Sequence, residues 1–81
     1  MSYAIEWHAA AEAELLRVPH WKTAAAIDGA VIRFAESGVG AVERVGNHPN
    51  RYRLRVLGYD AVFMLDAASR TLTVIGVYRV R

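Results

Sequence analysis

The chain has 81 residues, of which 54% are hydrophobic and 22% are charged, and it contains no cysteine. This length and composition fit a single globular domain over residues 1–81 and exclude a disordered chain. The lack of cysteine excludes disulfide frameworks, thiolate metal sites and cysteine nucleophiles. No apolar run approaches the ~18 residues of a membrane span, and the N-terminus lacks the basic and apolar regions of a signal peptide, so we expect a cytoplasmic protein without membrane contact.

The net charge of +2 is distributed unevenly along the chain. Residues 1–43 carry a net charge of −3, whereas residues 44–81, with seven arginines and two aspartates, carry +5. The guanidinium group presents a planar fork of donors that suits phosphate and carboxylate oxygens. The C-terminal half is therefore a candidate surface for a polyanion or an acidic partner protein, and the alternative is a basic face that is simply solvated.

The first part of the chain predicts a short strand followed by two helices. Apolar and polar side chains alternate over residues 3–8, which is the period of a strand. Strong helix formers fill residues 9–17, and Pro19 ends this helix because the residue before a proline is pushed out of the helical region. A second helix is expected over residues 21–36, with an apolar stripe on one side, and Gly38 ends it.

The second part of the chain predicts four strands separated by turns. The segment 42–45 is a short, weak candidate, and 71–80 is rich in Thr, Val and Ile. Residues 51–56 alternate strictly between apolar side chains and arginines, which indicates a strand with one face on the core and one cationic face. Residues 59–65 are nearly all apolar and predict a central strand that is buried on both sides.

This order of elements, one strand, two helices and then four strands, favours an α+β fold. Strands that are grouped after helices are typical of an antiparallel sheet with the helices on one of its faces. We therefore expect two N-terminal helices packed on a twisted antiparallel sheet, in the order β-α-α-β-β-β-β.

The arginines of the second half suggest a site. A two-residue turn at 57–58 would place Arg55 opposite Asp60, on the same side of the sheet as Arg53. Arg79, far along the last strand, is expected to reach this face as well. Three converging guanidinium groups would bind a phosphate and would stabilise the charge that develops during phosphoryl transfer. The alternatives are three solvated arginines or a surface on which an acidic helix docks.

The same residues carry a resemblance to a known family. The segment 52–66, Tyr-Arg-Leu-Arg-Val-Leu-Gly-Tyr-Asp followed by an apolar strand and an acidic turn, resembles the core signature of the RelE/ParE toxin superfamily. Residues 76–79 are similar to its closing motif, and residues 3–7 to its opening strand. The first helix, with Ala11-x-x-Glu14-Leu15 and a stop at Pro19, resembles that of the family. The resemblance therefore covers nearly the whole chain in order and spacing.

This resemblance implies the toxin of a type II toxin–antitoxin system. RelE-like members enter the ribosomal A site and cleave mRNA without a metal or cofactor, using the 2′-hydroxyl of the RNA as the attacking group. ParE-like members share the fold, are not nucleases and poison DNA gyrase. Both kinds are silenced by an antitoxin that wraps the toxin, so the expected partners are a cognate acidic antitoxin and either the ribosome with mRNA or DNA gyrase.

The resemblance also implies particular site residues. The two strand cations of the family match Arg53 and Arg55, and its closing arginine matches Arg79, so these three are the expected catalytic residues. Three further residues are expected to contact the substrate, namely Arg51, Tyr78 and Arg81.

The sequence departs from the RelE pattern in three places. Asp60 stands where the family has an arginine, the strand cations are Arg53 and Arg55 rather than lysines, and the sequence ends at Arg81 without the C-terminal segment that often supplies a tyrosine. An arginine, whose pKa lies above ~12, makes a poor general base at neutral pH. We therefore expect a RelE-like ribosome-dependent mRNA interferase with a weakened active site. The alternatives are a ParE-like gyrase poison and a degenerate homologue that only binds an antitoxin.

Overall fold

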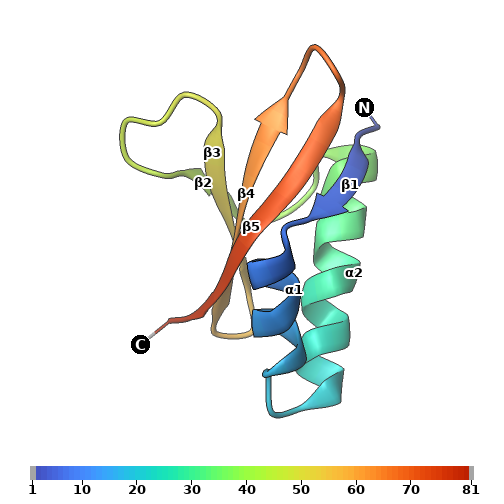
Figure 1. Ribbon diagram of the computed structural model, residues 1–81, viewed down its shortest axis with the longest axis vertical. Coiled ribbons are helices and arrows are strands. Elements are labelled where there is room, and N and C mark those ends of the chain that lie inside the picture. Colours follow the sequence, from blue (N-terminus) through green and yellow to red (C-terminus); the bar gives the residue numbers. More distant parts are fainter. Residues whose placement is uncertain (1, 81) are drawn as a thin grey trace.

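The computed structural model describes residues 2–80, which form two helices and one five-stranded sheet. Figure 1 shows both helices on the same side of the twisted sheet, near β1 and β5. This arrangement confirms the expected α+β architecture and element order. Neither described helix has the length and apolar character needed to cross a membrane. In chain order, the elements are β1 (Ala4–Trp7), α1 (Ala9–Leu16), α2 (Trp21–Ser37), β2 (Val42–Arg44), β3 (Arg51–Val56), β4 (Tyr59–Asp66) and β5 (Thr71–Arg79).

Capping interactions are present at the start of α1 and at the end of α2. The Nδ1 atom of His8 accepts a hydrogen bond from the backbone N–H of Ala10 at 3.2 Å, which caps the start of α1. At the end of α2, Gly38 adopts a left-handed conformation with φ of 76°, and its N–H donates to the carbonyl of Phe34 at 2.8 Å. Glycine occupies this conformation without the steric cost that other residues incur.

The sheet has the strand order β1-β5-β4-β3-β2, and one of its pairings differs from the expectation. Strands β2 to β5 form an antiparallel meander, but β1 lies parallel to β5, with Ala4 opposite Thr71 and Trp7 opposite Val74. The expected antiparallel sheet is therefore a mixed one. No tight turn links β1 to β5, because both helices and three strands lie between them, so turn geometry does not impose an antiparallel direction.

Only one face of the sheet contributes to the core, which corrects the expectation that residues 59–65 are buried on both sides. In β4, Ala61 and Phe63 are fully buried, whereas the alternating Val62 and Met64 are half-buried and exposed. The apolar side chains of the other face remain accessible because both helices cover the same face. We call the uncovered side, from which Val62 and Met64 project, the open face.

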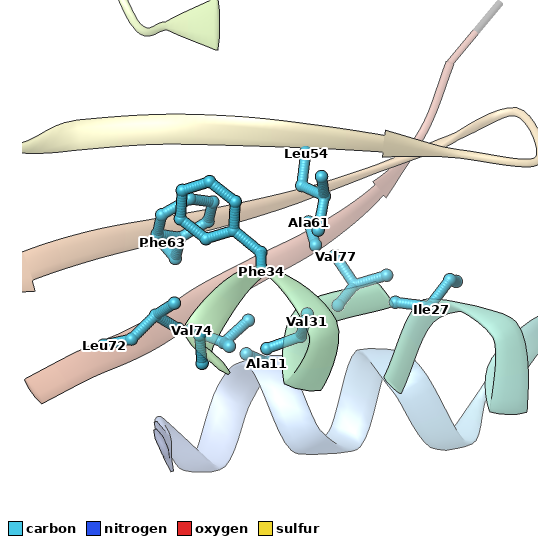
Figure 2. Packing of buried hydrophobic residues seen from close by; sticks show 11 residues of the cluster. Ala11, Ile27, Val31, Phe34, Leu54, Ala61, Phe63, Leu72, Val74 and Val77 are labelled. Carbon is cyan, nitrogen blue, oxygen red and sulfur yellow. The ribbon is translucent and has the colours of Figure 1, made fainter. Parts of the chain in front are cut away.

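Phe63 is fully buried in the core, where its ring lies next to that of Phe34 (Figure 2). Its ring centroid is 5.2 Å from that of Phe34 on α2 and 5.8 Å from that of Tyr52 on β3. These separations are typical of favourable aromatic pairs. The ring therefore connects α2, β4 and β3, which positions the arginine-bearing strand relative to the rest of the molecule.

A β-bulge interrupts the pairing of β4 with β5. Phe63 lies opposite Val74, but the preceding residue Val62 lies opposite Gly76, so Ile75 is an extra residue in β5. Such an insertion shifts the alternation of the side chains that follow it. Beyond the bulge, the side chains of β5 therefore point to the faces opposite to those that a regular strand would give them.

The turn between β3 and β4 has the expected length of two residues. Leu57 and Gly58 both have positive φ angles, 46° and 81°, as the tightest hairpin turns require. The turn places Arg55 opposite Asp60, which confirms the predicted register.

Replacing Phe63 with alanine should reduce the free energy of unfolding by about 3–5 kcal/mol, because it removes a fully buried ring and leaves a cavity. Urea denaturation followed by circular dichroism measures this loss. The neighbouring Met64→Ala is the matched control, because this side chain lies on the open face and should contribute less than about 1 kcal/mol. Equal losses for the two variants would contradict one-sided burial of the sheet.

Candidate functional site

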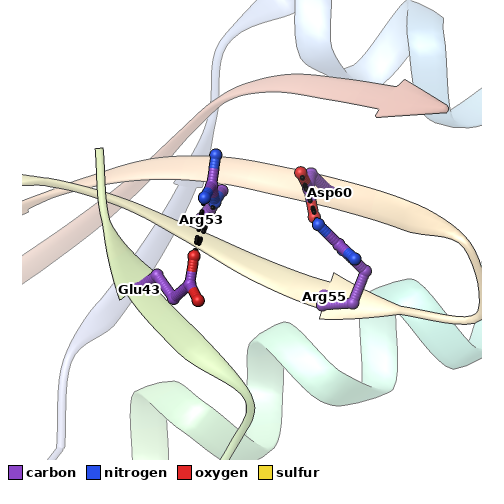
Figure 3. A network of polar contacts seen from close by, with 4 residues as sticks. All are labelled: Glu43, Arg53, Arg55 and Asp60. Carbon is purple, nitrogen blue, oxygen red and sulfur yellow. Dashed lines mark hydrogen bonds and ion pairs between the residues drawn. The ribbon is translucent and has the colours of Figure 1, made fainter. Parts of the chain in front are cut away.

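Arg53 and Arg55 project from β3 on the open face. They alternate with the buried Leu54, so both point away from the core. The pairing of β3 with β2 and β4 places Glu43 opposite Arg53 and Asp60 opposite Arg55. The structure thus brings the two expected strand cations together, and it adds a carboxylate beside each of them (Figure 3).

Asp60 holds Arg55 in a close ion pair. Nε of Arg55 donates to Oδ1 of Asp60 at 2.6 Å, and the side chain of Asp60 is only 14% exposed. The hydrogen bond to Asp60 raises the pKa of Arg55 above its already high usual value. Arg55 therefore stays a cation at any pH at which an ordinary protein is folded, and it cannot accept a proton as a general base.

Glu43 holds Arg53 in the same way. Its Oε2 accepts hydrogen bonds from the terminal NH2 group and from Nε of Arg53, at 2.6 Å and 3.2 Å. This partner was missed from the sequence, because Glu43 lies eight residues before the first of the alternating arginines, on a different strand. The loop of residues 45–50 between β2 and β3 is too long to fix a register, so the pairing was not predictable.

These four side chains surround a hollow on the open face. Its volume is about 330 Å³, and its remaining walls are Ala41 and Val42. Two guanidinium groups and two carboxylates give this cluster a formal charge of zero. The hollow has the donors to bind a phosphate, but an incoming anion must first compete with the resident carboxylates for them.

Arg79 does not join this cluster, which corrects the expected convergence of three arginines. The bulge places Arg79 opposite Tyr59, on the helix-bearing side of the sheet, while Tyr78 lies opposite Asp60 on the open face. Arg79 instead lines a separate hollow of about 350 Å³ together with Pro19 and residues of the α1–α2 turn and the β3–β4 turn. A regular strand would have placed Arg79 on the open face, and the bulge prevents it.

The three expected substrate contacts have different positions. Tyr78 lies on the open face and is 52% exposed. Arg51 lies on the same face, at the far end of β3, opposite Met64; its Nε is buried and has no hydrogen-bond partner among residues 2–80. The expectation for Arg81 falls outside the described residues. No three His, Asp or Glu side chains of the described chain gather into a group suited to a metal ion.

Comparisons with solved structures show the same fold in several toxins. The E. coli toxin RelE, in a mutant form in the free state, superimposes with a TM-score of 0.80 at 21% identity, over 98% of this chain and 84% of that one. The archaeal RelE–RelB complex from Pyrococcus horikoshii gives 0.80 at 13% identity, over 98% and 96%. No family model and no curated protein matches the sequence of this chain.

A structure from a ParDE system also has this fold. A chain of the chromosomal ParDE toxin–antitoxin system of Pseudomonas aeruginosa superimposes with a TM-score of 0.72 at 15% identity, over 98% of this chain and 97% of that one. The protein therefore has the RelE/ParE fold, as the sequence resemblance implied. The fold is common to both branches and does not distinguish between them.

Replacing both carboxylates, with Glu43→Gln and Asp60→Asn, should make binding of a single-stranded oligonucleotide more salt-dependent. Freeing two guanidinium groups for phosphates should steepen the slope of log K against log salt by about 1.4. Fluorescence anisotropy at several salt concentrations measures this slope. The control, Glu12→Gln with Glu36→Gln, makes the same change in net charge on the helices. If both double variants steepen the slope equally, net charge and not the hollow controls binding.

Proposed function

We propose that this protein is the toxin of a type II toxin–antitoxin system and acts as a RelE-like, ribosome-dependent mRNA interferase with a weakened active site. The observation that carries the proposal is the pair of arginines in the hollow on the open face. Arg53 and Arg55 are adjacent, solvent-accessible and held in place, as phosphate binding requires. Their carboxylate partners supply the reason for weak activity.

In the proposed reaction the 2′-hydroxyl oxygen of the RNA attacks the neighbouring phosphorus, and the 5′-oxygen of the next nucleotide leaves. One proton is removed from the attacking hydroxyl, and one is supplied to the leaving oxygen. Arg53 and Arg55 bind the non-bridging oxygens and stabilise the charge that develops on them. Neither guanidinium removes the proton, so Glu43 is the group with the right chemistry to accept it once its ion pair with Arg53 opens, and solvent water supplies the proton to the leaving oxygen.

The second candidate is a protein that binds another protein and does not cleave RNA. It is favoured by the zero net charge of the hollow, because each arginine that should hold a phosphate already holds a carboxylate. Such a protein would act on DNA gyrase, as ParE-like toxins do, or would only bind an antitoxin. The two candidates differ in whether mRNA is cut on ribosomes.

Induced in cells, the native protein should produce weak, codon-phased cuts in ribosome-bound mRNA, and Asp60→Arg should cut more strongly. The substitution removes an anion, frees Arg55 and adds a cation beside the scissile phosphate. Mapping of mRNA 5′ ends measures the effect. Asp60→Asn removes the anion alone and should give an intermediate result.

Efficient cutting by the native protein and weaker cutting by Asp60→Arg would show that Asp60 takes part in the chemistry. Intact mRNA in both, together with DNA damage and filamentation, would support the gyrase alternative. No effect on growth, with a folded protein, would identify a degenerate homologue.

The two faces of the sheet provide a further test of the site. Arg55→Ala should abolish cleavage, because it removes a phosphate ligand from the hollow. Arg79 lies on the helix-bearing face of β5, outside the hollow. Arg79→Ala should therefore retain most of the activity. The same mRNA mapping compares the two variants. Loss of cleavage in Arg79→Ala alone would place the reaction in the hollow next to the α1–α2 turn.

We also propose that a cognate antitoxin, with acidic residues, docks mainly against the helices. The open-face arginines already have carboxylate partners, whereas a groove of about 580 Å³ between α1 and α2 has a mostly apolar lining, to which Glu12 and Asp28 add two carboxylates. Leu16 and Trp21, which also line it, are 80% and 74% exposed. Acidic residues of the antitoxin would meet Arg17 and Lys22 at the nearby α1–α2 turn.

Trp21→Ala should weaken binding of the antitoxin encoded beside the toxin by about 30-fold or more, since exposed tryptophans at interfaces are common hot spots. Isothermal titration calorimetry measures the change, and the exposed position of Trp21 leaves the fold intact. Arg53→Ala is the comparison variant and should change the affinity little. The reverse ranking would move the docking surface to the arginine face.

A further inference from the structure

The ring of Tyr78 lies against the backbone of Gly76 on the open face. A Cβ atom built on Gly76 would be 2.5 Å from Cε2 and Cζ of Tyr78, and closer still to its hydroxyl oxygen. Gly76 is correspondingly buried, while Tyr78 itself is 52% exposed. The ring thus covers Gly76 and keeps about half of its surface free for a ligand.

This ring is close to the arginine pair. The sheet register places Tyr78, Asp60 and Arg55 side by side on three neighbouring strands, with all three side chains on the open face. Neighbouring strands are about 4.8 Å apart, so the backbones of Tyr78 and Arg55 are separated by two strand spacings, and the ring, which lies over Gly76, is in the row of Arg53. An aromatic surface and a phosphate-binding group therefore lie within the reach of one nucleotide.

We propose that Tyr78 is a stacking platform for an unpaired base of single-stranded RNA, and that Gly76 positions it by leaving room for the ring. The proposal deepens the function proposed above and rests on it for the identity of the nucleic acid. Single-stranded RNA presents base faces and phosphates next to each other, whereas a duplex hides the base faces inside its stack.

Base stacking contributes more to this binding than phosphate attraction does. The hollow beside the platform has no net charge, so phosphate attraction is weak until an ion pair opens. Stacking on an aromatic ring does not depend on charge, and it tolerates every base because each has a π face. A base held on Tyr78 would bring its own phosphate to the arginine pair and help it to displace a resident carboxylate.

The test uses a short single-stranded RNA that contains one 2-aminopurine, whose fluorescence is quenched when the base stacks. Binding to the native protein should quench it, and Tyr78→Ala should remove the quenching and weaken binding by about five- to 150-fold. Tyr78→Phe retains the ring and should stay within about twofold of the native affinity. An RNA backbone of the same length with abasic sites at every position should bind the native protein no better than intact RNA binds Tyr78→Ala.

Gly76→Ala tests the positioning role separately. Its Cβ would collide with the ring of Tyr78, which is a movable side-chain end, so the fold should persist while the ring shifts. Quenching should fall and affinity should drop part of the way towards that of Tyr78→Ala. In the Tyr78→Ala background the collision is absent, and adding Gly76→Ala should change RNA affinity by less than about twofold.

The outcomes separate this inference from the proposed function. Quenching that depends on Tyr78, with no mRNA cleavage on ribosomes, would uphold the platform and overturn the interferase. Ribosomal cleavage that is the same in native protein, Tyr78→Phe and Tyr78→Ala, with no change in quenching, would overturn the platform alone. Absence of any RNA binding, or an effect of Tyr78→Ala on antitoxin affinity only, would also overturn it.

Discussion

The extra residue Ile75 in β5 decides which side chains of the last strand reach each face of the sheet. A regular strand would place Arg79 on the open face and Tyr78 against the helices. The bulge reverses both, so a tyrosine lies beside the ion-paired arginines and the last described arginine lies near the α1–α2 turn. The composition of the site therefore depends on a feature of the backbone that lies outside the site.

The positive charge of the arginine-bearing strand β3, which was expected to be the strongest on the molecule, is neutralised by neighbouring carboxylates. The C-terminal half is basic as a whole, but its two central arginines are each bound by a carboxylate. Asp60 comes from the same half, and Glu43 comes from the end of the acidic half. The sheet thus brings opposite charges together from segments that are separate in sequence, and it leaves a hollow with ordered donors and no net charge.

Local patterns were sufficient to predict most of the fold and half of the site. Helical periodicity and the helix-ending Pro19 correctly predicted both helices. The assumed two-residue turn before Tyr59 correctly predicted that Arg55 lies opposite Asp60. Three features were beyond such reasoning because each depends on non-local contacts. They are the parallel pairing of β1, the Glu43–Arg53 pair across a longer loop, and the bulge, whose one local mark is the isolated Gly76 within β5.

The parallel pairing of β1 with β5 joins the two ends of the described chain. Nearly every other element lies between Ala4 and its partner Thr71 in the sequence, and pairings across such a long stretch of chain are expected to form slowly because closing the loop costs entropy. The meander of β2 to β5, built from neighbouring segments, is free to form earlier and to present an unpaired edge to solvent. In kinetic terms, β1 is the closing element of the fold, and a species without it has the arginine pair in place and an aggregation-prone strand at its border.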